Sequence, residues 1–265
     1  MGEICQNVLP LRPWEDPRLM RLPGLVPITP GQWLQVDDAY PAQMARRQVL
    51  VRDRRAEVLQ DGAATAQALQ ELLGAVLAQL KMRSDFKVTQ DQVTCPDGRV
   101  VAINPARVLE TLASLVQEDF CLLQKPTGGG EHILAGALLC FPASWTLAEK
   151  LGRPLAAIHG PVASYSPDIA RRVQRLFDGV HPERPIWRAN CLLYDDAELF
   201  QPRSEKAPRP APGTGKKWVR IERQSIVKMA ETGCVVFSIH TYQRRLEDLA
   251  KTDREAILAR FDGAS

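Results

Sequence analysis

The stretch Leu138–Tyr165, LLCFPASWTLAEKLGRPLAAIHGPVASY, decides how the rest of the chain is interpreted. It begins as an apolar strand, turns at Phe141-Pro142, and continues as a helical segment that Ser144 or Thr146 can cap. The segment ends at His159, which lies among apolar residues. An imidazole in this setting is either a core side chain bonded to a backbone carbonyl or an axial ligand of a buried metal. The pattern alone leaves both interpretations open.

Two strand-like runs precede the helical segment and three follow it: Phe120–Leu123, Ile133–Phe141, Ile186–Tyr194, Trp218–Val227 and Cys234–Tyr242. The first two are separated by a glycine-rich segment that we interpret as a hairpin turn, because it lacks the features of a phosphate-binding loop. This order predicts an α+β domain with a five-stranded antiparallel sheet and helices over one face. It matches the PAS fold, in which the helices between the second and third strands cover a ligand cavity.

The N-terminal residues 1–45 are rich in proline and irregular. They contain Trp14 and Trp33, and large aromatic side chains in a polar arm predict that it packs on the domain. We therefore expect three parts, which are a Pro-rich arm at 1–45, a domain with N-terminal helices at 46–245, and a C-terminal helix or tail at 246–265.

Further elements follow from spacing and turn residues. Leucines at three- and four-residue steps predict a helix over about Asp61–Met82, and Asn104-Pro105 opens a second one. Between them, Pro96-Asp97-Gly98 predicts a short hairpin. The segment Pro202–Lys217 is rich in proline, glycine and lysine, which predicts an exposed loop.

Composition limits the classes of function. The chain has 265 residues, a formal net charge of +3 and scattered cations, which argues against nucleic acid as the main partner. It has no apolar run of the roughly 20 residues that a membrane helix needs, and no secretory signal pattern. The six cysteines show no CxxC spacing, so a zinc knuckle or a cysteine-ligated cluster is not expected. Most of them lie in apolar runs, which indicates a reducing compartment, the cytoplasm.

The chain has four histidines. His132 follows the glycine turn and is predicted to be exposed, His181 lies in a polar loop, and His240 lies in the last strand, on either face. A single histidine such as His159 cannot hold zinc, which takes three or four protein ligands, but it can hold haem, where the porphyrin supplies the other nitrogens.

Two strands carry polar side chains in alternation. Arg188 and Asn190 share one face of their strand, and this face is either solvated or turned to a cavity, where Arg188 would pair with an anion such as a haem propionate. Arg220, Glu222 and Gln224 likewise share a face. A buried carboxylate is costly unless paired. Glu222 therefore pairs with Arg188, binds a cationic substrate, or belongs to a cross-strand ion pair at the sheet surface.

Three segments resemble one family: residues 141–165 (FPASWTLAEKLGRPLAAIHGPVASY), residues 184–196 (RPIWRANCLLYDD) and residues 219–242 (VRIERQSIVKMAETGCVVFSIHTY). The family contains the haem-binding α subunit of haem-dependent oxidative N-demethylase. The likeness extends to LVPITPGQWLQVDDAYPAQMARRQVL, so it covers most of residues 25–245.

The resemblance implies a PAS-like fold that binds haem b and removes a methyl group oxidatively from a secondary amine such as dimethylamine, with O₂ as co-substrate and formaldehyde as product. It also implies that electrons come from NADPH through partner subunits carrying FMN and a [2Fe–2S] cluster. The chain has neither a dinucleotide fingerprint nor cluster spacing, which agrees with an external electron supply.

The resemblance also implies roles for individual residues. His159 matches the haem ligand, Arg188 and Arg223 become cofactor-binding candidates, and Glu222 and Asn190 become catalytic candidates, with Glu222 suited to a dialkylammonium ion. The chain departs from the family pattern at three places. Cys191 stands where we expect Trp, His240 stands where we expect Arg, and Ala163-Ser164 lacks a proline that we expect after Pro161-Val162. A changed pocket is therefore one hypothesis. The alternative to an enzyme is a non-catalytic PAS-like module that binds haem or another small molecule as a sensor, and a third hypothesis is a structural subunit.

Overall fold

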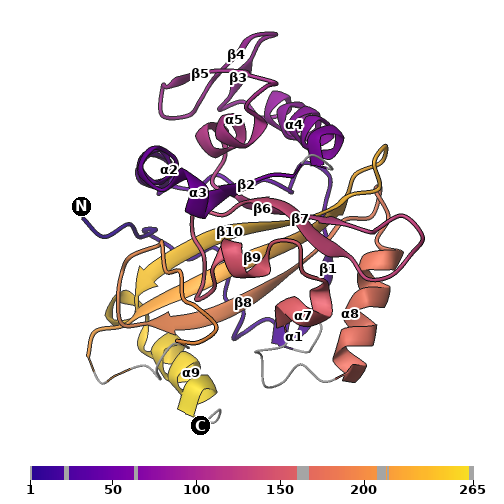
Figure 1. Ribbon diagram of the computed structural model, residues 1–265. Helices are drawn as coiled ribbons and strands as arrows, with labels where there is room; N and C mark the ends of the chain where they lie inside the picture. Colours follow the sequence, from indigo (N-terminus) through magenta and orange to yellow (C-terminus); the bar gives the residue numbers. More distant parts are fainter. Residues whose placement is uncertain are drawn as a thin grey trace.

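The computed structural model describes residues 2–20, 24–62, 65–159, 167–207, 213 and 215–262. Its centre is an antiparallel sheet of seven strands (Figure 1). In spatial order these are β1 (Val26–Pro27), β8 (Ile186–Tyr194), β9 (Trp218–Lys228), β10 (Val235–Arg245), β6 (Asp119–Gln124), β7 (Ile133–Leu138) and β2 (Leu59–Gln60).

The five predicted strands form the middle of this sheet. The two additional strands, β1 and β2, have two residues each and extend its two edges by pairing with β8 and β7. A strand of two residues is too short to show the alternation of apolar and polar residues by which strands are predicted. These two strands were therefore not predicted, and the sheet is larger than expected. The turn between β6 and β7 is the predicted one, and Gly128, Gly129 and Gly130 all have positive φ there.

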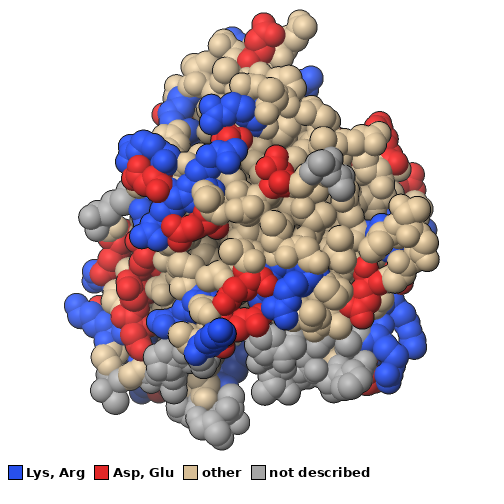
Figure 2. All heavy atoms as spheres, in the orientation of Figure 1, with Lys and Arg blue, Asp and Glu red and all other residues tan. Residues whose placement is uncertain are grey.

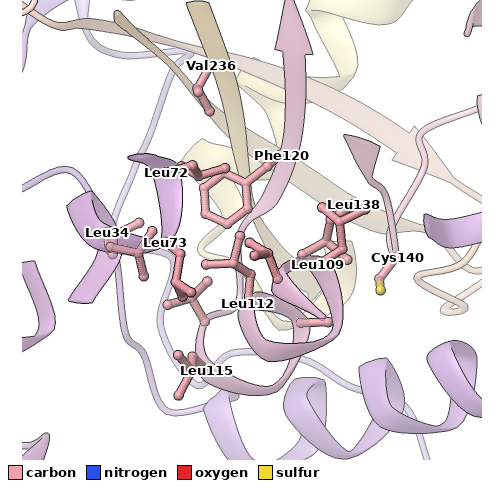
Figure 3. Packing of buried hydrophobic residues seen from close by; sticks show 14 of the residues in the cluster. Leu34, Leu72, Leu73, Leu109, Leu112, Leu115, Phe120, Leu138, Cys140 and Val236 are labelled. Carbon is pink, nitrogen blue, oxygen red and sulfur yellow. The ribbon is translucent and has the colours of Figure 1, made fainter. Parts of the chain in front are cut away.

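Helices α2 (Tyr40–Asp53), α4 (Ala66–Lys81) and α5 (Val108–Leu115) contribute to the apolar core on one face of the sheet. Figure 3 shows this core, in which Leu72, Leu73 and Leu112 surround Phe120 of β6. α4 lies within the predicted helix Asp61–Met82. Because Leu72, Leu112 and Phe120 are completely buried, each contributes about 1.5–3 kcal/mol of transfer free energy.

The opposite face is covered by α6 (Leu147–Lys150), α7 (Leu155–His159) and α8 (Pro167–Gly179). β6 shows why both faces are covered. Phe120 and Leu122 belong to the first core, whereas Cys121 and Leu123 belong to the second. The expectation of helices over one face is therefore wrong, because β6 has buried side chains on both of its faces.

Smaller elements complete the molecule. A second sheet is formed by β3 (Lys87–Val88), β4 (Gln92–Thr94) and β5 (Val100–Ala102), and its β4–β5 hairpin is the predicted one. There are two short helices, α1 (Pro17–Met20), which contacts β8, and α3 (Arg55–Val58), which directly follows α2. The chain ends with a 3₁₀ turn at Leu246–Asp248 and α9 (Lys251–Asp262).

The N-terminal arm contacts the sheet through its tryptophans. Trp14 and Trp33 are both buried, and Trp33 donates a hydrogen bond to Ser238 Oγ of β10 at 2.9 Å. α2 already begins at Tyr40, so the irregular stretch is shorter than predicted. Figure 2 shows that basic and acidic side chains are interspersed on the face in view. Within the described ranges, no helix combines the length and apolar character needed to span a bilayer.

Candidate functional site

A cavity of about 510 Å³ lies between the sheet and the helices α6, α7 and α8. Its volume is within the roughly 300–1,000 Å³ typical of small-molecule sites. Most of its wall is apolar and includes Leu123, Trp145, Ile158, Phe177, Ile226 and Phe237. Such a wall suits a ligand that is largely hydrophobic. The polar side chains within the wall are therefore the candidates for recognising polar groups of that ligand.

Strand register directs polar side chains into this cavity. In the β8–β9 pair, Asn190 lies opposite Glu222 and Arg188 lies opposite Gln224. Arg188, Glu222 and Gln224 line the cavity together with Ile226. The two polar alternations predicted from the sequence therefore meet on one face of the sheet, and this face is turned to the cavity.

Glu222 is the central polar group. Its side chain is almost completely buried. Its Oε1 atom accepts a hydrogen bond from Arg220 at 3.2 Å, and its Oε2 atom accepts hydrogen bonds from Asn190 at 2.9 Å and from Gln224 at 3.0 Å. Asn190 Oδ1 in turn accepts the backbone N–H of Glu222 at 3.0 Å. Three donors thus compensate the burial of the carboxylate and fix its orientation.

Arg220 links this carboxylate to the turn at Phe141-Pro142. Its guanidinium is fully buried and donates to the backbone carbonyl oxygens of Leu199, at 3.0 Å, and of Phe141. It also lies over the Tyr194 ring, 5.8 Å from its centroid. The Phe-Pro turn that leads into α6 is therefore attached to the same side chain that pairs with Glu222.

Two further arginines line the cavity. Arg188 and Arg203 each have a buried Nε–H that finds no hydrogen-bond acceptor. Burial lowers the pKa of Arg188, the positive charge of Arg260 lowers it further, and Glu222 acts in the opposite direction. An unpaired buried donor is rare in folded proteins. Arg47 and Arg220 also have one, but their other N–H groups donate to carbonyl and carboxylate oxygens, whereas Arg188 and Arg203 form no hydrogen bond with the described residues.

Arg223 is not brought to the cavity. It projects from the other face of β9, where it donates to the carbonyl oxygens of Trp33 and Gln32, both at 2.9 Å, and to Ser225 Oγ at 3.0 Å. Its guanidinium stacks over the Trp187 ring at 4.8 Å. Arg223 therefore holds the N-terminal arm on the sheet, and the structure does not place it beside the other candidates.

The histidines fall in different places. His159 is the last residue of α7, directly after Ile158, which lines the cavity; the side chain of His159 and residues 160–166 lie outside the described residues. His181 is exposed. The prediction of an exposed His132 is wrong, because its side chain is packed on Phe177 and bonded to Gln174 at 3.1 Å.

His240 is buried on the face of the sheet that is turned away from the cavity. Its Nε2 lies 3.0 Å from Asp37 Oδ2 and its Nδ1 lies 3.2 Å from Glu118 Oε1. Burial by itself lowers the pKa of His240, but the hydrogen bonds to the two carboxylates outweigh it and raise the pKa to about 9. The imidazole is therefore a cation at neutral pH, so this position keeps a positive charge although Arg is absent.

A second departure from the family pattern, Cys191, also lies away from the cavity, and the third, Ala163-Ser164, lies outside the described residues. Cys191 is buried in the apolar cluster that contains Leu193 and Ile221. Neither Cys191 nor His240 lines the cavity. The hypothesis that these two residues reshape the pocket by direct contact with a ligand is therefore not supported.

Sequence reasoning missed two cationic residues at the cavity, Lys150 and Arg203. Lys150 is nearly buried and donates to Ile158 O at 2.6 Å and to Glu205. Arg203 belongs to the predicted exposed loop, whose composition gives no sign that its first residues reach a cavity. Among the described residues no group of three or more His, Cys, Asp or Glu side chains converges as a metal site. Haem needs only one protein ligand, so this finding leaves it open.

Comparison with known proteins gives one match. Residues 24–263 match the sequence model of the family described as haem-dependent oxidative N-demethylase, alpha subunit-like. None of the curated proteins compared with the chain matches it.

Proposed function

The chain belongs to the haem-dependent oxidative N-demethylase, alpha subunit-like family, and on this premise we propose that it binds haem b and takes part in the oxidative N-demethylation of a small secondary amine. The observation that carries the proposal is the buried Glu222 carboxylate, held by three donors in the wall of an otherwise apolar cavity. An anionic group in an apolar pocket is suited to a dialkylammonium ion.

The residues of the cavity fit haem in three respects. The apolar wall suits the porphyrin faces, and the unpaired Nε–H of Arg188 suits a propionate carboxylate. The last turn of α7 forms part of the wall at Ile158, and we propose that the next residue, His159, would hold the haem iron. The helices between β7 and β8, the second and third central strands, cover the cavity, which supports the PAS-like interpretation of the fold.

Haem supplies the activation of O₂, and the residues of the chain position and prepare the amine. Glu222 would pair with the dialkylammonium cation and hold it in the cavity. Asn190 and Gln224 both donate to Glu222 Oε2 and fix the orientation of the carboxylate. The apolar side chains around them exclude water, which strengthens this electrostatic contact.

The family description names an alpha subunit, which implies that other subunits exist. We propose that they supply electrons from NADPH through FMN and a [2Fe–2S] cluster. We also propose a cytoplasmic location, because the six cysteines are all free thiols and five of them are buried.

Turnover of dimethylamine tests this function. The full chain is loaded with haem and supplied with O₂, dimethylamine and a reductase, and formaldehyde and methylamine are quantified. We expect both products in equal amounts. A chain that binds haem and responds spectrally to gases, but neither responds to amines nor releases formaldehyde, would instead be the sensor module.

A further inference from the structure

Arg203 is held in place although it lies in a loop. On one side, the carbonyl oxygen of Gln201 accepts the backbone N–H of Ser144 at 3.0 Å. On the other side, Ser204 Oγ donates to Glu149 Oε1 at 2.6 Å, and the backbone N–H of Glu205 donates to Glu149 Oε2 at 3.1 Å. The loop is thus attached on both sides of Arg203, to Ser144 before α6 and to Glu149 of α6, so the arginine has a defined position in the cavity wall.

The cations that line the cavity differ in whether they have a partner. Among the described residues, Lys150 is paired with Glu205, whereas neither Arg188 nor Arg203 forms an ion pair. Glu222 does not serve them, because among the described residues its ion pair is with Arg220 and it forms no hydrogen bond with Arg188 or Arg203. The Nε–H groups of Arg188 and Arg203 are both buried without an acceptor. The cavity therefore contains two guanidinium groups whose natural partner is an anion.

We propose that Arg188 and Arg203 together recognise a ligand with two carboxylates, one for each guanidinium. A guanidinium presents paired N–H donors in a planar fork that matches a carboxylate, and a lysine cannot reproduce this geometry. In an apolar cavity of about 510 Å³ such a ligand combines a hydrophobic body with two acidic side chains. Resting on the proposed function, this ligand is haem b and the carboxylates are its two propionates.

The test compares haem with its dimethyl ester, which has the same porphyrin but no carboxylates. The full-length protein free of haem is titrated with each compound, and the dissociation constants are read from the Soret absorbance. The variants are Arg188→Gln, Arg203→Gln and Arg203→Lys. The control is Arg171→Gln, which removes an exposed arginine of α8.

We expect the wild-type protein to bind the ester at least about tenfold more weakly than haem, since hydrogen bonds to charged groups are the stronger ones. Arg188→Gln and Arg203→Gln should each weaken haem binding about tenfold and leave ester binding unchanged. Arg203→Lys should lie between the wild type and Arg203→Gln, and the control should equal the wild type.

Two other results are distinguishable. If the wild type and both glutamine variants bind haem and its ester equally well, the two-arginine proposal is wrong while haem binding itself stands. If the wild type binds neither compound, the proposed function fails as well.

Discussion

At the residue scale, Glu222 is the group on which the chemistry depends. A carboxylate inside an apolar cavity is unfavourable unless its charge is compensated. Arg220, Asn190 and Gln224 provide this compensation while leaving the carboxylate at the cavity surface. Strand alternation alone predicted that Glu222, Gln224 and Arg220 share a face. It did not predict that Arg220, rather than Arg188, is the partner, because pairing within the face depends on the turn at Phe141.

Replacing Glu222 with Gln tests its role. The change keeps the shape of the side chain and removes the negative charge, so we expect the affinity for dimethylammonium to fall about thirtyfold or more. Haem affinity should not change. The measurement is the amine-induced shift of the Soret band, and Glu231→Gln, at an exposed position, is the control. An unchanged amine affinity in Glu222→Gln would show that the carboxylate does not bind the substrate.

At the element scale, a buried charge network holds the N-terminal arm on the sheet. His240 of β10 lies between Asp37 of the arm and Glu118, which precedes β6. Asp37 also accepts hydrogen bonds from Gln6 and Gln117, both at 3.0 Å. The arm thus contributes a carboxylate to the sheet, and the protonated imidazole compensates it. The sequence placed His240 on a strand but did not reveal its face, because the partners are distant along the chain.

This network predicts a pH dependence of stability. The folded-state pKa of His240 is raised from 6.5 to about 9, so its stabilisation is fully present below pH 6.5 and is lost as the pH rises through 9. The shift corresponds to about 3 kcal/mol at most. The free energy of unfolding, measured by urea denaturation between pH 6.5 and 9.5, should fall in the wild type.

His240→Gln should be less stable at pH 6.5, since it leaves two buried carboxylates without a cation. Its stability should fall less steeply with pH, and the fall that remains comes from buried thiols such as Cys121 and Cys140, whose raised pKa favours the unfolded state near pH 9. His181→Gln, an exposed histidine, is the control. The pKa of His132 is lowered by burial, so its titration affects stability only below pH 6.5. If the free energy of unfolding falls equally steeply with pH in the wild type and in His240→Gln, His240 is not the cause of the fall.

At the scale of the whole molecule, the elements that could be predicted from the sequence are those whose apolar residues recur at the spacing of a helix or a strand. The five long strands and α4 were found because their apolar spacing extends over several turns or pleats. The edge strands β1 and β2 are too short for this, and their pairing depends on contacts with β8 and β7. Arg203 was missed because its place at the cavity depends on the tertiary contacts of Glu149, which spacing does not encode.

Haem binding should stabilise the whole molecule, because the cavity lies between the sheet and three helices that close over it. With free haem at 100 times its dissociation constant, the free energy of unfolding should rise by about 2.7 kcal/mol. Urea denaturation with and without haem measures this gain. A gain of the same size with the cavity blocked by Ile226→Trp would place haem elsewhere on the protein.

The most direct test of the account is the absorption spectrum of the full chain produced with ample haem, compared with that of His159→Ala and of the exposed-site control His181→Ala. We predict a Soret band in the wild type and in the control, a shift of that band on addition of dimethylamine, and the loss or displacement of the band in His159→Ala. Protein that shows no Soret band, or a band that is identical in His159→Ala, would contradict the claim that His159 holds haem in this cavity.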